Sequence, residues 1–266
     1  MPYFNIYKYG DVYKIVWFNG ENNEKKKKTD KKYLESISEG IREYNKGNVN
    51  FFFEQQLKKN VTKLENNIIR AKSKVVEYSL CNEWEYFVTL TLDKTKQDRY
   101  DLDKYIKDLG NWINNYNKKY NTKLKYILIP EKHKISKGWH LHGLFSGITS
   151  DSLEKNKNGY LDLPYYKNRF GWISLDKIRD KTACSFYITK YITKDMSDRI
   201  NDIGGHLYYC SKGLNHKEIV VGSHIDIDEK YKRAFFRNEY CNILWCDEIP
   251  EIIKEKYNEF IDRLDE

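Results

Sequence analysis

KGWHLHGLFSGI, residues 137–148, places two of the chain's 6 histidines one residue apart within an apolar segment. In a β-strand, side chains two residues apart point to the same face of the sheet. His140 and His142 are therefore expected to stand side by side, while Leu141 helps to pack the core. Neutral imidazoles are common metal ligands, so the pair is a natural start for a metal site. On this stretch alone, a pair of half-buried strand histidines without a metal remains the alternative.

The segments on both sides of this stretch predict an α+β fold. Runs rich in β-branched and aromatic residues predict strands, and apolar residues spaced by three or four predict helices. The expected elements, in chain order, are a strand at 85–93, a helix at 101–121, strands at 125–133, 138–145 and 171–178, and a helix at 180–200. This order is typical of a split βαβ fold with a central antiparallel sheet and helices on one face.

The segments outside that core predict extensions at both ends. Alternating polar and apolar residues around YGD predict a β-hairpin at 3–18. The polar, lysine-rich stretch at 20–32 predicts a loop, and a helix is expected at 50–80. A short strand and a helix near 250–264 are expected towards the C-terminus. The expected parts are an N-terminal hairpin, basic loop and helix (1–77), a core domain (78–216) and a C-terminal extension (217–266).

The composition predicts a well-packed chain with an anionic partner. Its 266 residues are 40% hydrophobic and 15% aromatic, enough to bury a sizeable core. Five scattered cysteines without a C-x-x-C spacing predict reduced thiols rather than a disulfide or zinc framework. No apolar run approaches the roughly 20 residues that span a bilayer, and no signal peptide is evident, so we expect a cytosolic protein without a membrane partner. The net charge of +8 favours a polyanion.

A basic segment of the expected helix at 50–80 is a candidate contact for nucleic acid. Arg70, Lys72 and Lys74 lie just before the first strand of the core. Lysine and arginine side chains bind backbone phosphates, and such contacts make the affinity depend on salt. These three side chains are therefore predicted to bind the phosphates of a nucleic acid.

A carboxylate extends the histidine pair into a possible ligand set. Glu131 lies near the end of the strand before the histidines, across a short turn, so its side chain can reach the same face. Two imidazoles and one carboxylate leave coordination positions open for a substrate, as a catalytic cation requires.

The doubled sequence YITKYITK, residues 187–194, supplies two tyrosines and two lysines. At about 100° per residue, Tyr187, Lys190, Tyr191 and Lys194 fall within a sector of about 100° on one helix. A phenol beside an ammonium and a metal-bound phosphate can ionise and attack phosphorus. The spacing of the tyrosines alone arises readily by chance in a chain with 23 of them, and exposed lysines on a solvated helix face are an alternative for the lysines.

Three motifs in this order resemble those of the HUH endonucleases. FVTLTLD (87–93) is similar to their first motif, HLHGLF (140–145) to their metal motif, and YITKYITK to their nucleophile motif. The set is most similar to the rolling-circle replication initiators of small bacteriophages and plasmids, in the branch with two tyrosines. The resemblance covers residues 78–218 and implies an RRM-like HUH endonuclease domain in the core. In the first motif, the threonines and Asp93 are expected to be structural.

The resemblance implies a site chemistry. His140 and His142 would hold a divalent cation, Mg²⁺ or Mn²⁺, with Glu131 as third ligand, whereas His133 is expected to be a solvated turn residue. Tyr187 or Tyr191 would attack single-stranded origin DNA, leaving a 5′-phosphotyrosine and a free 3′-hydroxyl that primes a host polymerase. The lysines of the doubled sequence, Lys190 and Lys194, would contact phosphate or lower the pKa of a tyrosine.

The remaining implications concern partners and rival functions. The sequence contains no G-x-x-x-x-G-K-[ST] motif, so unwinding is expected to come from a host helicase in a bacterial cytoplasm. One rival is a relaxase or transposase of the same superfamily, although relaxases usually carry a third histidine and the small transposases one tyrosine. The other rival is a non-catalytic DNA-binding protein that recognises the origin.

Overall fold

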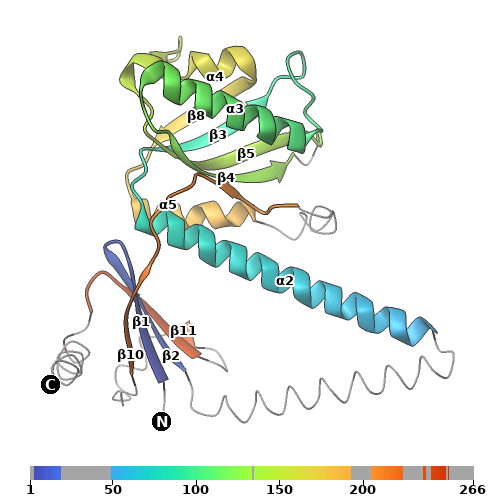
Figure 1. The fold of residues 1–266 in the computed structure, drawn as a ribbon, viewed down its shortest axis with the longest axis vertical. Coiled ribbons are helices and arrows are strands. Elements are labelled where there is room, and N and C mark those ends of the chain that lie inside the picture. The colour runs from blue at the N-terminus through green and yellow to red at the C-terminus, as the bar shows by residue number, and fades with distance from the viewer. Residues whose placement is uncertain are drawn as a thin grey trace. The chain divides into compact units, whose positions relative to one another are not determined.

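The chain divides into two compact units in the computed structural model (Figure 1). The structure describes residues 3–18, 49–133, 135–192, 205–223, 236–237, 241–249 and 251. One unit comprises Met1–Lys63 with His216–Glu266, and the other comprises Leu64–Asn215, so helix α2 (Val49–Cys81) belongs partly to each. No helix among the described residues is long and apolar enough to cross a membrane.

The centre of the Leu64–Asn215 unit is an antiparallel sheet of five strands in the order β8-β3-β5-β4-β9. Their bounds are β3 Tyr86–Leu92, β4 Lys125–Lys132, β5 Trp139–Ser146, β8 Gly171–Lys177 and β9 Tyr209–Cys210. A small hairpin of β6 (Glu154–Lys155) and β7 (Leu161–Asp162) follows a 3₁₀ turn, η1 (Ser150–Ser152). The predicted core strands and the mixed α+β class with a central antiparallel sheet are confirmed.

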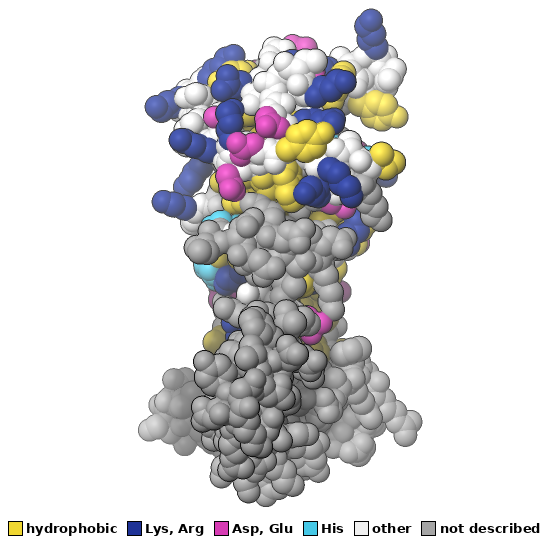
Figure 2. Space-filling model, turned by 90° about the vertical axis from the view of Figure 1, so that its right-hand side faces the viewer, with side chains coloured by type: hydrophobic (Ala, Val, Ile, Leu, Met, Phe, Trp, Pro, Cys, Tyr) yellow, Lys and Arg dark blue, Asp and Glu magenta, His cyan; other side chains and the backbone are white. Residues whose placement is uncertain are grey.

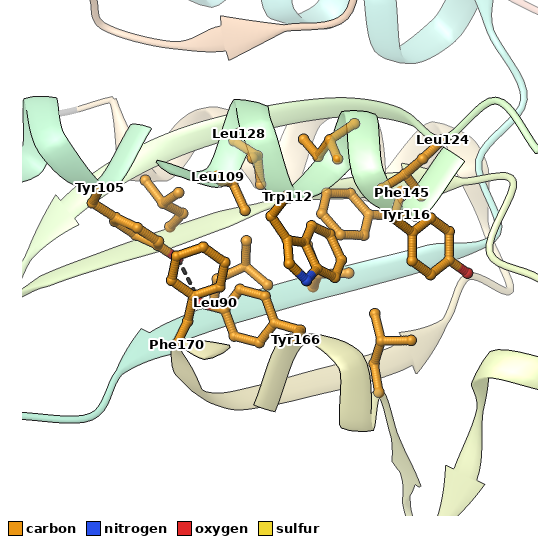
Figure 3. Close-up of a cluster of buried hydrophobic side chains, with 14 of the residues drawn as sticks. Leu90, Tyr105, Leu109, Trp112, Tyr116, Leu124, Leu128, Phe145, Tyr166 and Phe170 are labelled. Carbon is orange, nitrogen blue, oxygen red and sulfur yellow. Dashed lines mark hydrogen bonds between the residues drawn. The ribbon is translucent and has the colours of Figure 1, made fainter. Parts of the chain in front are cut away.

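Helix α3 (Leu102–Tyr120) covers one face of this sheet. The Asp101 side chain caps its first turn by accepting a hydrogen bond from the Lys104 amide at 2.9 Å. Its inward stripe is the predicted one and includes Tyr105, Leu109, Trp112, Ile113 and Tyr116, all buried. Figure 3 shows this stripe packed with Tyr166 and Phe170 around helix α4 (Pro164–Arg169), over Leu90 and Leu128 of the sheet.

The other face of the sheet is also covered by helices, so the expectation of helices on one face is wrong. The C-terminal part of α2, helix α5 (Lys181–Tyr187) and the 3₁₀ turn η2 (Ile188–Tyr191) pack there (Figure 1). The reason lies in β4, where Ile127, Leu128 and Ile129 are consecutive and fully buried. Because neighbouring residues of a strand point to opposite faces, such a run needs a cover on both sides.

The predicted helix at 180–200 is shorter than expected. It begins at the Asp180 cap, whose carboxylate accepts from the Ala183 amide at 2.8 Å, but α-helical geometry ends at Tyr187. The next turn is 3₁₀, and Thr189 Oγ1 donates to the Phe186 carbonyl at 2.7 Å. A run of β-branched residues and a side chain that competes for backbone acceptors both weaken an α-helix. Residues 193–200, including Lys194, lie outside the described residues.

The second unit contains another five-stranded sheet, in the order β10-β1-β2-β12-β11. The hairpin predicted at 3–18 is confirmed as β1 (Tyr3–Tyr9) and β2 (Val12–Phe18), joined at Gly10 with φ 61°. Its partners are β10 (Glu218–Ser223), β11 (Phe236–Arg237) and β12 (Cys241–Cys246). The two ends, which the sequence treats as separate extensions, thus contribute to one sheet. The loop predicted at 20–32 and nearly all of the helix predicted near 250–264 lie outside the described residues.

Gly143 is predicted to be irreplaceable in the central sheet. A Cβ built there would lie 2.1 Å from the Ile127 carbonyl oxygen and 2.6 Å from Leu128 Cδ2. Gly143→Ala should therefore lower the free energy of unfolding by about 1–3 kcal/mol through overpacking, as measured by urea denaturation. Gly110→Ala is the control, because a Cβ on that helical glycine meets nothing within 4 Å; it should raise stability by about 0.5–1 kcal/mol. Equal midpoints for Gly143→Ala and the wild type would contradict the prediction.

Candidate active site

The register of three strands places the predicted ligand residues on one face of the sheet. His140 of β5 pairs directly with Thr91 of β3 and with Glu131 of β4. His142 pairs with Thr89 in the next row. Directly paired residues of an antiparallel sheet have their side chains on the same face. The structure therefore brings His140, His142 and Glu131 together, as the sequence predicts.

The carboxylate of Glu131 reaches diagonally to the second histidine. Its Oε2 lies 2.8 Å from Nε2 of His142. A carboxylate is an acceptor only, so Nε2 of His142 donates this hydrogen bond. The His142 side chain is 12% exposed and that of Glu131 is 42% exposed, so the contact lies at the border between core and solvent.

Two threonines of β3 hold the other nitrogen of each histidine. Thr89 Oγ1 lies 3.2 Å from Nδ1 of His142, and Thr91 Oγ1 lies 3.0 Å from Nδ1 of His140. A hydroxyl can donate or accept, so it supports either ring tautomer and fixes the ring orientation. With Nδ1 engaged, Nε2 of His140 is left for a ligand, whereas Nε2 of His142 is bound to Glu131. The threonines expected to be structural thus position the histidines, and T-L-T facing H-L-H with the same spacing of two was the available signal.

His133 is a residue of the site that the sequence reading placed in solvent. Its ring lies 5.4 Å from the ring of His140, measured between centroids. Its Nδ1 accepts hydrogen bonds from the amides of Ile135 at 3.3 Å and Ser136 at 3.1 Å, which close the turn after β4. His133 is exposed, as expected, but the turn that it stabilises places its ring next to that of His140.

Both strand histidines are held in the neutral form. Burial lowers the pKa of His140, and the neighbouring His133, His142 and Arg99 act in the same direction, while Glu131 opposes them. Burial also lowers the pKa of His142, again against Glu131. A neutral imidazole has a lone pair to offer, so this electrostatic environment favours ligation of a cation over protonation.

One of the two predicted tyrosines lies directly over His142, and the other packs against the first. The ring of Tyr191 stacks on that of His142, with centroids 3.9 Å apart and planes 10° from parallel. Tyr187 packs edge to face against Tyr191 at 6.1 Å and is 50% exposed. Phe87 of β3 contacts both rings, at 5.8 Å for Tyr187 and 6.3 Å for Tyr191. The two tyrosines share one site but differ in their exposure to solvent.

Lys190 distinguishes the two phenols further. Its ammonium donates a hydrogen bond to the Tyr187 hydroxyl and lies 4.8 Å from the centre of the Tyr191 ring. The hydrogen bond from Lys190, followed by one from Tyr191, lowers the pKa of Tyr187. Burial, and then the hydrogen bond to Tyr187, raises the pKa of Tyr191. Tyr187 is therefore the phenol that ionises more readily. Lys194, the second predicted lysine, is outside the described residues.

The three predicted DNA-binding residues lie on α2. Arg70 and Lys74 line a pocket of about 410 Å³ with His206 and Tyr208, whereas Lys72 is half-buried on the same helix. Lys74 also binds Glu77 at 2.7 Å, which offsets part of its charge. Figure 2 shows one face of the molecule, where Lys and Arg side chains are spread widely over the described part of the Leu64–Asn215 unit. A role of the three residues in DNA binding stays a prediction.

The donor atoms for a cation are present without a complete ligand group. Among the described residues, no three His, Cys, Asp or Glu side chains are arranged so that they could hold a metal ion. Glu131 and His142 bind each other directly. The donor set combines a carboxylate oxygen, which suits Mg²⁺ and Mn²⁺, with imidazole nitrogens, which bind first-row transition metals.

One comparison with known proteins links part of the chain to replication-associated proteins. Residues 85–196 match the family model of the replication-associated protein ORF2/G2P. This segment includes the histidines, Glu131 and both tyrosines, while the basic residues of α2 precede it. No curated protein and no solved structure matches the chain. The family match is consistent with a replication initiator of the Rep type and implies interaction with DNA.

The pKa of Tyr187 is expected to depend on Lys190. The ammonium stabilises the phenolate, so Lys190→Gln should raise the pKa of Tyr187 towards the ordinary value near 10. Tyrosine-labelled ¹³C NMR, with the signal assigned through Tyr187→Phe, measures this shift. Lys155→Gln, which removes a charge from the β6–β7 hairpin, is the control and should leave the titration unchanged. An identical curve for Lys190→Gln and wild type would contradict the assignment.

Proposed function

We propose that this protein is a two-tyrosine HUH endonuclease that initiates rolling-circle replication by nicking and rejoining single-stranded origin DNA. The observation that carries the proposal is the stack of Tyr191 on His142, with Tyr187 packed edge to face against Tyr191 and His140 on the same face of the sheet. The family match over residues 85–196 supports it independently, because it links this segment to replication.

The residues present suit a divalent cation of the Mg²⁺ or Mn²⁺ class. His140, His142 and Glu131 would hold it, and the threonine contacts to Nδ1 would make Nε2 the ligand atom of each histidine. When bound, the cation supplies Lewis-acid polarisation of the scissile phosphate and neutralises its charge.

The chain's own residues supply the nucleophile. Lys190 stabilises the phenolate of Tyr187, which attacks phosphorus; a bond forms between the tyrosine oxygen and phosphorus, and the bond from phosphorus to the 3′ oxygen breaks. The electron pair leaves with that oxygen, which takes up a proton to become a 3′-hydroxyl. The 5′ end stays on the enzyme as a phosphotyrosine, and the 3′-hydroxyl primes a host polymerase. A host helicase would supply the unwinding in the bacterial cytoplasm.

The different surroundings of the two tyrosines suggest an order of use. Tyr187 is exposed and bound to Lys190, so it suits the first attack on incoming DNA. Tyr191 is held as a neutral phenol between His142 and Tyr187. After the first cut, Lys190 is released from the Tyr187 phenolate and would turn to Tyr191, whose ring centre lies 4.8 Å from its ammonium. The second tyrosine then makes the second cut, and the free 3′-hydroxyl resolves the first adduct.

One observation favours a second candidate, a non-catalytic protein that binds origin DNA. The described residues contain no ready three-ligand group, and a pure binding protein needs none. A relaxase or transposase of the same superfamily is the other alternative. A covalent-adduct assay with single-stranded DNA distinguishes the non-catalytic binding protein from the enzymes. Mapping the cut on origin DNA then distinguishes a replication initiator from a relaxase or transposase.

Loss of either strand histidine is expected to abolish cleavage. His140→Ala and His142→Ala each remove a ligand of the proposed cation, so nicking of single-stranded DNA in Mn²⁺ should fall by at least about 10²-fold. Thermal melts should stay close to wild type, because both side chains lie at the edge of the core. His216→Ala, in the other unit, is the control. Nicking at the wild-type rate by either strand variant would exclude the metal assignment.

The double change Tyr187→Phe, Tyr191→Phe is expected to yield no covalent DNA adduct. Both single variants should retain some cleavage, and Tyr187→Phe should lose more of the first cut, because Lys190 binds its hydroxyl. Gel shift under denaturing conditions and peptide mapping of the adduct measure both effects. Tyr160→Phe, an exposed tyrosine of the β6–β7 turn, is the control. A linkage mapped to Tyr116, Tyr120 or another tyrosine would refute the assignment.

A further inference from the structure

The loop between β3 and α3, residues 93–101, is a built surface next to the histidine rows. Asp93 Oδ1 accepts hydrogen bonds from the amide of Thr95 at 2.9 Å and from its hydroxyl at 2.8 Å. Lys96 Nζ donates to the Lys167 carbonyl at 2.9 Å, and Gln97 reaches α4 in the same way. The loop is therefore tied to α4 as well as to its own strand.

This loop lines an open pocket of about 630 Å³ that has a basic lining. The cationic residues around it are Lys94, Lys96, Arg99 and Lys104, and Asp98 is the acidic one. Lys104 binds Asp108 at 2.9 Å, so the other three cations dominate the field in the pocket. A pocket lined by fixed cations of one sign attracts an anion.

Arg99 connects this pocket to the histidines. Its carbonyl accepts from the Trp139 amide at 2.8 Å, one residue before His140, and its side chain packs against Gly138 at 3.2 Å from an ideal Cβ. Among the residues that the structure describes, Arg99 Nε is buried and has no hydrogen-bond partner. The buried Nε is closed to solvent, but the Arg99 side chain as a whole is half-buried and lines the pocket. The terminal Nη groups of a guanidinium bind phosphate oxygens well.

Trp172 completes the surface on the edge strand. It pairs with Thr91, which pairs with His140, so all three side chains lie in one row on one face. Two strand spacings place Trp172 about 10 Å from His140. Its ring is 62% exposed, and Lys167 Nζ lies 5.5 Å from the ring centre. Lys167 is also paired with Asp162, so the exposed ring itself is the main feature of this surface. Bases of a single strand stack on exposed aromatic rings.

We propose that Trp172 and the 93–101 loop form a DNA subsite beside the scissile phosphate, in which a base stacks on Trp172 and a flanking phosphate binds Arg99. The inference rests on the proposed function and adds to it the path of the single strand away from the tyrosines. The strand crosses the open end of β3 and β8, where Lys96 and Lys167 link pocket and ring.

Fluorescence anisotropy of the full chain with a labelled single strand of about 30 nucleotides tests the subsite. Trp172→Ala should weaken binding by about 5- to 100-fold, and Trp172→Phe should retain most of the affinity because the ring remains. Arg99→Gln should weaken binding and lower the slope of log affinity against log salt by about 0.7, the value for one phosphate contact. Tyr160→Ala and Lys155→Gln, an exposed aromatic and a charge outside the subsite, should bind as wild type.

The outcomes separate the subsite from the proposed function. Wild-type affinity in both Trp172→Ala and Arg99→Gln, in a protein that forms the covalent adduct, would overturn the subsite and leave the function intact. Weakened binding in both variants, with no adduct from wild type on any single strand, would support the subsite as a DNA-binding surface and reject the nuclease. Equal loss in Trp172→Phe and Trp172→Ala would also overturn the stacking role. If Trp172→Ala fails to fold, the affinities of Arg99→Gln and Trp172→Phe test the subsite: wild-type affinity in Arg99→Gln, or a large loss of affinity in Trp172→Phe, would overturn it.

Discussion

The antiparallel register of β3, β5 and β4 is the constraint on which the rest of the site depends. It pairs Thr91 with His140 and Glu131, and it pairs Thr89 with His142. Because side chains alternate along a strand, a slip of one residue would move the histidines to the face covered by α3. Burial on both faces resists such a slip. So does Gly143, where the Ile127 backbone approaches too closely for any side chain.

On this face of the sheet, the side chains are buried at one end of the strands and form the candidate site at the other end. The row that contains Ile127 and Leu144 is buried, the next row holds His142 under Tyr191, and the last row is open. Side chains are therefore progressively more exposed towards the end of β3. This gradient explains the electrostatics, since burial is the first cause of the lowered pKa of His142 and of the raised pKa of Tyr191. Tyr187 lies at the exposed end, so the hydrogen bond from Lys190 affects its pKa more than burial does.

Sequence patterns predict what local spacing controls. The strands, the inward stripe of α3 and the common face of His140 and His142 all follow from periods of two and of 3.6 residues. Residue spacing does not predict the features that depend on tertiary packing. The 3₁₀ turn at Ile188–Tyr191 replaces the expected helix, and helices cover both faces because of one apolar run in β4. Arg99 and Trp172 carry no recognisable motif, because their positions next to the histidines arise only from the loop conformation and the register.

The exposure of Trp172 is best understood through this distinction between core and site. Stability alone favours covering a large aromatic ring, and the same face is covered by α2 and η2 over its other rows. The edge strand β8 instead presents Trp172, Ser174 and Asp176 outwards, while Leu175 faces the core. Polar neighbours on an edge strand discourage pairing with another chain. The polar neighbours also leave one face of the Trp172 ring exposed to solvent. A base of a single strand is flat and can stack on that face.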